Sequence, residues 1–239
     1  MRDPGAAFIT GGTGAVGHAV TRAFLASGYR VAVTYRGAEG WSALVGAEAA
    51  AADEGRLIGL AADVTDPAAM KRAADQAASA FHGLAALVHV AGGYAGGANV
   101  EDVAPETVRA MIDLNLLSAF WAARAVVPHA KRSARGRLLF VSSRGALDPG
   151  SGAAAYTASK LGLHALVATL ANELKSAGVT ANAVLPGLID TPANRDAMPN
   201  GNFDLWLKPE AIAALLLFLA SDEAASTSGA LIPIDGRSA

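Results

Sequence analysis

Apolar residues along this chain follow two alternating patterns. Short, nearly continuous apolar runs are separated by longer segments in which apolar residues recur every three or four positions. The first pattern is typical of buried strands and the second of helices with one apolar face. We expect strands at 6–10, 30–34, 57–61, 85–90, 137–141, 179–185 and 230–234, and helices at 15–27, 41–52, 105–131, 154–176 and 209–220.

Turn and cap residues mark the ends of several helices. Gly28 follows the first helix as a C-terminal cap. Asp66 and Pro67 open a further helix, with Asp66 as its N-cap and Pro67 in its first turn. The segment 105–131 predicts one long helix, or two in series, bent near Pro128. The segment 192–207, rich in Pro, Asn and Gly, predicts a loop.

The alternation of strands and helices predicts the fold class. It favours an α/β fold of Rossmann type, a doubly wound parallel sheet with helices on both faces. The chain contains no linker, low-complexity segment or fixed-period repeat. We therefore expect a single domain over residues 1–239.

Composition limits the possible partners. Hydrophobic residues make up 52% of the chain and charged residues 17%, which predicts a folded protein with a large core. The formal net charge is −2 and no basic cluster is present, so we expect no nucleic-acid or membrane partner. The chain has no Cys and its histidines do not cluster at ligand spacing, so we expect no metal.

Two segments bear on localisation. Residues 1–5 lack the apolar core of a signal peptide. The most apolar late run, 211–220, is shorter than the roughly 20 residues that span a bilayer. We expect a cytoplasmic protein.

A glycine-rich turn joins the first expected strand to the first helix. Such glycines permit a tight turn and let a pyrophosphate approach the backbone, while the helix N-terminus supplies amide donors. The alternative is a purely structural turn. The residues predicted to bind the phosphates are Gly11, Thr13, Gly14, Ala15, Val16 and Gly17.

The second expected strand ends with Tyr35 and Arg36. A cofactor without a ribose phosphate usually meets an acidic residue about 20 residues after the glycine turn. A guanidinium instead matches a phosphate in charge and geometry. We therefore expect NADP(H) to be preferred, with NAD(H) possible, and Thr13 or Arg22 are candidates to assist. The alternative is that Arg36 is a solvated surface residue.

Two further segments complete the expected cofactor site. Asp63 and Val64 follow the third strand, where the carboxylate either accepts a bond from the adenine amine or forms a turn or helix cap. Small residues close the fourth strand and would let the cofactor lie against the sheet edge. These are Ala91, Gly92 and Gly93.

Tyr156 and Lys160 lie four positions apart on an expected helix, hence on one face. A nearby ammonium favours the phenolate and lowers the pKa of a Tyr, which can then exchange a proton with a carbonyl oxygen. Ser143 ends the fifth strand, at the edge where parallel sheets bind ligands. Asn115 is polar among apolar neighbours. It either bonds a helix carbonyl or a water that relays protons to Lys160, or is a satisfied core amide.

The order and approximate spacing of these residues resemble the short-chain dehydrogenase/reductase family, classical type, over essentially the whole chain. The resemblance implies that Ser143 binds the carbonyl, Tyr156 is the acid/base, Lys160 holds the ribose hydroxyls and tunes Tyr156, and Asn115 completes a relay. It also implies cofactor contacts from Tyr156, Lys160, Pro186, Gly187, Ile189 and Thr191. The chain departs from the family at Ala15, where a Gly is usual, and at His89, where an Asn is usual. We interpret His89 as a packing substitution.

Loop segments at 90–97, 146–148 and 188–206 resemble one subfamily, dihydropteridine reductase. Those enzymes carry an acid where Arg36 stands and lack the serine found at Ser143. We expect a substrate lid over residues 191–209. The candidate pocket residues, with core or lid packing as the alternative, are Tyr94, Met198, Phe203 and Trp206.

The sequence thus predicts an NADPH-dependent oxidoreductase that moves a hydride between the nicotinamide and a small carbonyl or alcohol substrate. One alternative is a dihydropteridine or quinone reductase-like activity. Another is a catalytically silent NADP-binding regulator. The Ala-rich faces of 105–131 and 154–176 also predict a homodimer or homotetramer.

Overall fold

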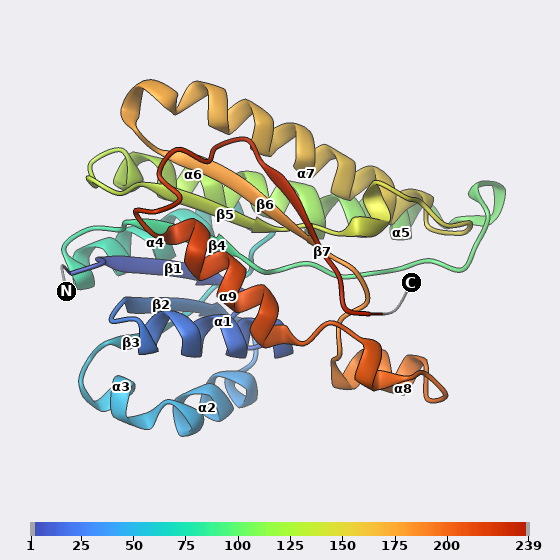
Figure 1. Cartoon of the computed structure of the whole chain (residues 1–239), viewed down its shortest axis with the longest axis horizontal. Coiled ribbons are helices and arrows are strands. Elements are labelled where there is room, and N and C mark those ends of the chain that lie inside the picture. Colours follow the sequence, from blue (N-terminus) through green and yellow to red (C-terminus); the bar gives the residue numbers. More distant parts are fainter. Residues whose placement is uncertain (1–2, 238–239) are drawn as a thin grey trace.

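The computed structural model describes residues 3–237. Its strands form one parallel sheet of seven strands in the order β3-β2-β1-β4-β5-β6-β7 (Figure 1). The strand order reverses beside β1, which pairs with both β2 and β4. The strands are β1 (Ala6–Thr10), β2 (Arg30–Tyr35), β3 (Leu57–Ala61), β4 (Ala86–His89), β5 (Arg137–Val141), β6 (Thr180–Pro186) and β7 (Leu231–Ile234).

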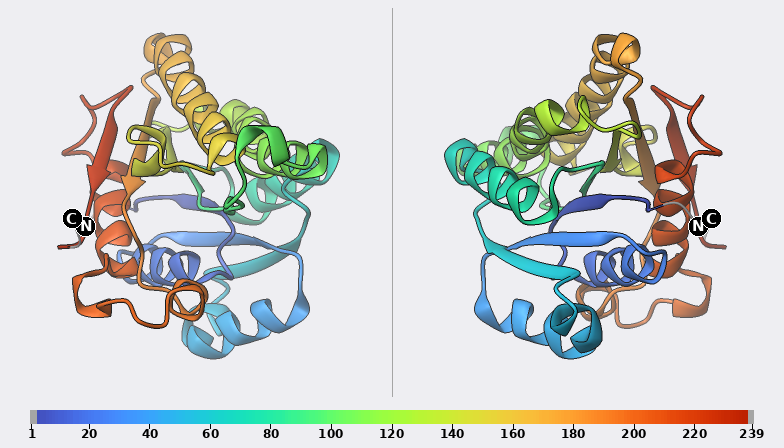
Figure 2. Two further views of the ribbon diagram at one scale, coloured as in Figure 1. Left: turned by 90° about the vertical axis from the view of Figure 1, so that its right-hand side faces the viewer. Right: turned by 90° about the vertical axis from the view of Figure 1, so that its left-hand side faces the viewer.

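Helices cover both faces of the sheet (Figure 2). One layer contains α4, α6 and α7, and the other contains α1 and α9, which pack against each other. The helices are α1 (Ala15–Ala26), α2 (Ala38–Ala47), α3 (Ala49–Asp53), α4 (Pro67–Phe81), α5 (Pro105–Ile112), α6 (Ser118–Ala130), α7 (Ala154–Glu173), α8 (Pro192–Ala197) and α9 (Pro209–Ala220).

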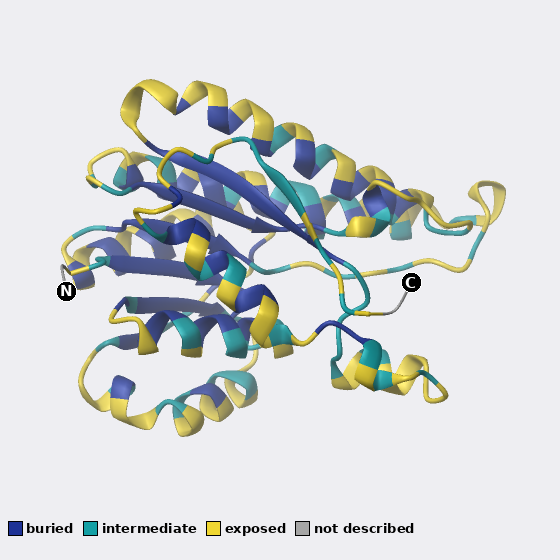
Figure 3. Cartoon of the chain, in the orientation of Figure 1, coloured by how far each residue is buried: buried dark blue, intermediate teal, exposed yellow. Residues whose placement is uncertain are grey.

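The sheet separates two apolar cores. Successive strand residues point to opposite faces, so Phe8 packs with the α4 and α6 layer and Ile9 with the α1 and α9 layer. Both side chains are fully buried, and Figure 3 shows the central strands buried along their length. Burial on both faces explains why the strands read as continuous apolar runs and not as alternating ones. The predicted fold class is confirmed.

Cap residues behave as the sequence predicts at two helices. The Asp66 side chain accepts a hydrogen bond from the amide of Ala68 at 2.8 Å, and Pro67 is the first residue of α4. Gly28, after α1, has a φ of +87°, a conformation in which Gly avoids the steric cost of a Cβ. The single helix expected at 41–52 is wrong. Two helices, α2 and α3, meet at Glu48, whose φ of −122° is not helical.

The segment 105–131 forms two helices in series. They are joined by a π-helical turn, η2 (Asp113–Leu117), and Pro128 lies inside α6. The irregularity therefore lies at Asn115 and not where the proline was expected to bend the helix. By length and composition this stretch could cross a membrane, but 44% of its most apolar window is buried inside the molecule. Its apolar character is accounted for by packing against α4 and β4.

The loop expected at 192–207 contains a short helix, α8, and a 3-10 turn, η5 (Phe203–Leu205). Thr191 caps α8, because its Oγ1 accepts from the amide of Asn194 at 3.2 Å, and Pro192 is its first residue. A Thr followed by Pro is a recognisable helix start. The high content of Pro, Asn and Gly in this segment concealed that signal.

Candidate active site

A cavity of about 600 Å³ opens at the carboxyl ends of β1, β2 and β4. This is the point where the strand order reverses, the usual ligand crevice of such sheets. Figure 1 shows α8 and the β4–α5 connection at this same end of the molecule. The expected cofactor residues that line the cavity are Gly11, Thr13, Gly14, Ala15, Val16, Gly17, Tyr35, Arg36, Val64, Ala91, Gly92 and Thr191.

Several lining residues were missed. Most adjoin residues that were predicted, and they complete the same strand ends and the start of α8. Leu114 adjoins the predicted Asn115 in the π-helical turn, but no local signal places its side chain beside the glycine turn. The missed residues are Thr34, Ala62, Val90, Leu114, Pro192 and Ala193.

The glycine turn has no room for side chains at two positions. A Cβ on Gly11, whose φ is +68°, would lie 2.7 Å from the amide nitrogen of Ala91. A Cβ on Gly17 would lie 2.1 Å from the carbonyl oxygen of Gly11. Gly14, the N-cap of α1, has no side chain to bond the amides of the first turn. The turn therefore fits a dinucleotide pyrophosphate held by backbone amides.

Arg36 is exposed at the rim of this cavity. Beside it, the ring of Tyr35 stacks on Trp41 with centroids 5.4 Å apart. Arg22, considered as an assistant, instead pairs with Glu48 through a 2.8 Å contact. Arg36 is thus the cation that the cavity lining offers to a ribose phosphate.

Asp63 does not line the cavity, although both of its neighbours do. Its Oδ1 accepts from the amide of Thr65 at 2.8 Å and from the Thr65 hydroxyl at 2.7 Å. These bonds, the backbone one most, lower the pKa of Asp63. The side chain forms the turn that was one of the two expected alternatives.

Ser143, Tyr156 and Lys160 come together where β5 and α7 meet. Ser143 caps a short turn, η3 (Arg144–Ala146), and its Oγ accepts from the amide of Gly145 at 3.1 Å. The Nζ of Lys160 lies 6.0 Å from the Tyr156 ring centroid and donates to the carbonyl of Val141 at 3.1 Å. The Ser143 side chain also interacts with the Tyr156 phenol, so the three side chains predicted from spacing are neighbours.

Lys160 reaches the edge of the cavity. A Cβ placed on Gly92, which lines the cavity, would lie 3.2 Å from Nζ of Lys160. The Lys160 side chain is buried, and desolvation lowers its pKa to about 8. Neither Lys160 nor Tyr156 is itself part of the cavity lining, but the ammonium lies between Gly92 of that lining and the Tyr156 ring.

The pKa of Tyr156 moves opposite to the sequence expectation. Burial raises it, the side chain of Ser143 offsets part of the rise, and Tyr94 adds to it. The expectation assumed an ammonium close to the phenol oxygen. Lys160 instead donates to a backbone carbonyl, so loss of solvent dominates over its charge.

Asn115 is fully buried in the π-helical turn. Its Oδ1 accepts from the amide of Gly93 at 2.9 Å, and its Nδ2 donates to the Gly93 carbonyl at 3.0 Å and to Ser159 Oγ at 3.1 Å. Ser159 in turn donates to the carbonyl of Tyr156 at 2.6 Å. Asn115 therefore ties the end of β4 to α7, as a satisfied amide. Ser159 is a site residue that spacing did not single out.

His89 bridges three elements in the core. Its Nδ1 contacts Thr10 Oγ1 at 2.8 Å and its Nε2 contacts Ser118 Oγ at 3.2 Å. Complete burial lowers its pKa to about 3. A neutral imidazole that joins β1, β4 and α6 has a packing role, as expected.

The four candidate pocket residues separate into two groups. Tyr94 is 66% exposed and its ring meets Tyr156 edge-on, with centroids 5.0 Å apart. Trp206 is buried and packs against Gly201 and Phe203. None of Met198, Phe203 and Trp206 lines the cavity at the strand ends. The geometry of these three matches the lid-packing alternative.

Gly187 and Ile189 lie just before the lid in the sequence. Gly187 donates its amide to Ile234 at 2.9 Å and faces Asp235, whose Oδ1 would lie 2.4 Å from an added Cβ. Ile189 pairs with Leu207 in a short parallel bridge. Neither they nor Pro186, the last residue of β6, line the cavity, whereas Thr191 does.

Within residues 3–237, no group of three or more His, Asp or Glu side chains is placed to hold a metal ion. The cavity instead offers backbone amides, small residues and one exposed guanidinium, and the Tyr156 phenol and the buried Lys160 ammonium lie close to its edge at Gly92. That combination suits a dinucleotide and an adjacent polar group that gains or loses a proton.

Comparisons with known proteins identify a matching family and similar proteins. The family model described as short chain dehydrogenase matches residues 5–201. The chain is 34% identical over 234 residues to the 3-alpha-(or 20-beta)-hydroxysteroid dehydrogenase of Mycobacterium tuberculosis, covering 96% of this chain and 87% of that protein. It is 32% identical to the 3-oxoacyl-[acyl-carrier-protein] reductase MabA of the same species, covering 95% and 90%.

A solved structure is also similar to this chain. The blue fluorescent protein from a metagenomic library, in complex with NADPH, superposes with a TM-score of 0.88 at 30% identity. The match covers 98% of both chains.

Proposed function

The chain belongs to the short-chain dehydrogenase/reductase family of oxidoreductases, and on that premise we propose that it is an NADPH-dependent reductase of small carbonyl substrates, or the reverse dehydrogenase. The observation that carries the proposal is the meeting of Ser143, Tyr156 and buried Lys160 beside a cavity that fits a dinucleotide. A regulator that only binds NADP would need the cavity but not a phenol beside a buried ammonium. The presence of both groups therefore favours an enzyme over such a regulator.

When bound, a nicotinamide cofactor would supply or accept the hydride. Tyr156 donates a proton to the substrate oxygen in reduction and recovers it in oxidation. The Ser143 hydroxyl, which interacts with the phenol, holds that oxygen in place. Lys160, at the edge of the cavity, would hold the ribose hydroxyls of the bound cofactor. Asn115 keeps α7 in register with the end of β4.

The preference for NADPH rests on Arg36. Its guanidinium stands at the rim of the cavity, after β2, where the ribose of a bound dinucleotide would lie. A fork of N–H donors suits a phosphate and gives little to a bare ribose hydroxyl. The structural relative that holds NADPH supports this choice.

A ketone or a β-ketoacyl compound is the first-choice substrate. The hydroxysteroid dehydrogenase and the 3-oxoacyl reductase to which the chain is similar are named for an alcohol and a carbonyl substrate. The lid is short, so a modest substrate is favoured. We further propose that the protein is cytoplasmic and forms a homo-oligomer. The second proposal is supported by α5, α6 and α7, which expose the apolar side chains of Val108, Phe120 and Leu161.

Oxidation of NADPH and NADH by the purified protein across ketones, β-ketoesters, quinones and quinonoid dihydropterin tests this proposal. We expect turnover of a ketone with NADPH, and a rate loss of about a hundredfold in Ser143→Ala because the substrate oxygen loses its donor. Turnover of quinonoid dihydropterin alone, unaffected by Ser143→Ala, would favour the pterin reductase. Tight NADPH binding with no turnover of any compound would favour the silent regulator.

A further inference from the structure

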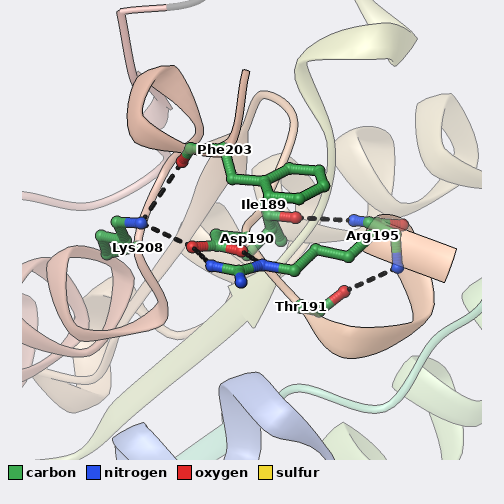
Figure 4. A network of polar contacts seen from close by, with 7 residues as sticks. Ile189, Asp190, Thr191, Arg195, Phe203 and Lys208 are labelled. Carbon is green, nitrogen blue, oxygen red and sulfur yellow. Dashed lines mark hydrogen bonds and ion pairs between the residues drawn. The ribbon is translucent and has the colours of Figure 1, made fainter. Parts of the chain in front are cut away.

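One carboxylate joins both ends of the lid. Asp190, directly before the lid, accepts two hydrogen bonds from Arg195 of α8, from Nε at 2.5 Å and from Nη2 at 2.8 Å (Figure 4). The same carboxylate accepts from Nζ of Lys208 at 2.5 Å. Lys208 directly precedes α9. Asp190 thus connects the start, the helix and the end of the lid.

The burial of these groups is uneven. The Asp190 side chain is 7% exposed, whereas those of Arg195 and Lys208 are 48% and 49% exposed. The two cations cover the carboxylate and hold its pKa well below its usual range. The network therefore has a shielded anion at its centre and two cations that face solvent.

Further contacts make the lid one connected unit. The amide of Asp190 donates to the carbonyl of Leu207 at 2.8 Å. The guanidinium of Arg195 lies 4.7 Å from the ring centroid of Phe203, and Lys208 donates to the carbonyl of Phe203 at 3.3 Å. Figure 4 shows Arg195 and Lys208 meeting at Asp190, with Phe203 beside them.

The network adjoins the wall of the cofactor cavity. Thr191, the next residue, lines that cavity together with Pro192 and Ala193. Asn194 bonds back to the same base, because its Nδ2 donates to the carbonyl of Ile189 at 2.8 Å. A shift of α8 relative to Asp190 would therefore move this part of the wall.

We propose that Asp190 is a positioning residue that holds the lid against the cofactor by its negative charge. The proposal rests on the proposed cofactor binding, because the wall at 191–193 acts on a bound dinucleotide. An amide at this position keeps the size of the side chain but has one oxygen and no charge to offer to two cations. The lid would then detach from its base while the sheet remained intact.

The test compares Asp190→Asn with Asp196→Asn. Asp196 is an exposed carboxylate of α8 with no hydrogen-bond partner found among the described residues, so its loss removes the same charge without the network. Hydrogen exchange is followed in peptides of the lid and of β1 and β4, and the NADPH dissociation constant is measured. For Asp190→Asn we expect faster exchange in the lid only and NADPH binding weakened about fivefold, with kcat at saturation changed by less than about twofold. Asp196→Asn should match the wild type.

Two results would overturn the proposal. One is lid exchange and NADPH affinity in Asp190→Asn equal to those of Asp196→Asn. The other is an Asp190→Glu variant, which keeps the charge, as defective as Asp190→Asn. Failure of the proposed function looks different: NADPH would then leave exchange of the glycine turn unchanged in the wild type, while the lid comparison between the variants would still decide the role of Asp190.

Discussion

The two sides of the cavity are built in different ways. On the glycine-turn side, backbone atoms pack so closely that Gly11 and Gly17 have no space for a methyl group. On the lid side, the geometry depends on charged side chains, and the cations of Arg195 and Lys208 are about half exposed. Close backbone packing is insensitive to solvent, whereas exposed ion pairs are weak and screened. The first side is therefore preorganised and the second adjustable.

A further pair of charged side chains lies close to Ser143. Arg144, next to Ser143, pairs with Asp235, which packs against Gly187. The turn that follows Ser143 is thus joined by charge to the residue that follows β7. A rigid glycine-turn side fits the chemistry that members of a family share. A lid side that single side chains can alter fits a substrate that differs from one member to the next.

The largest effect should come from adding one methyl group to the rigid side. Gly17→Ala forces the backbone of the turn apart, and we expect a loss of about 3 kcal/mol in the free energy of unfolding. Urea unfolding measures it. Gly46→Ala in α2, where an added Cβ meets nothing within 4 Å, is the matched control and should not lose stability. Equal stability of the two variants would refute the close-packing argument.

The folding stability that depends on buried His89, which joins β1 to β4 and α6, should decrease in acid. His89 has a pKa near 3 when folded and about 6.5 when unfolded, so the unfolded chain binds the extra proton between these values. Stability is lost as the pH falls below 6.5, by about 2 kcal/mol between pH 6.5 and 5. His89→Asn should reduce this slope in thermal unfolding curves. An unchanged slope would mean that His89 is not the group that titrates.

The choice of cofactor should depend on a single cation. Arg36→Ala should weaken NADPH about tenfold and leave NADH unchanged, because only the ribose phosphate loses a partner. Fluorescence titration with both cofactors measures this. Arg124→Ala, an exposed arginine of α6 outside the cavity lining, is the control. Equal losses for the two cofactors would contradict the assignment of Arg36.

The smallest effect should come from salt. Raising the ionic strength from about 0.1 to 1 M shortens the screening length from about 10 to 3 Å and weakens exposed ion pairs. Hydrogen exchange should then accelerate by about twofold in lid peptides and stay constant in the glycine turn. Equal acceleration on both sides would remove the distinction between them.

The sequence predicted the glycine-turn side of the cavity better than the lid side. Strand positions followed from continuous apolar runs, and Gly11 and Gly17 from their place between a strand and a helix. Tyr156, Lys160 and Ser143 were found because helix spacing and the end of β5 are local features. The contacts of Leu114 and Ser159 depend on how α5, α6 and α7 pack, which no local pattern encodes.

The prediction that the pKa of Tyr156 is lowered was wrong for a related reason. Spacing places Lys160 on the same helix face but does not say that its ammonium donates to Val141. The Asp190 network joins residues 18 positions apart through long side chains. It depends on a lid conformation that proline and glycine content alone did not reveal.

The most direct test of the account separates binding from chemistry at Tyr156. NADPH affinity and the rate of ketone reduction are measured for the wild type and for Tyr156→Phe. We predict a dissociation constant within about twofold of the wild type and a rate reduced by about a hundredfold or more, because the proton donor alone is lost. A rate that survives in Tyr156→Phe would contradict the proposed reaction and the role of this site.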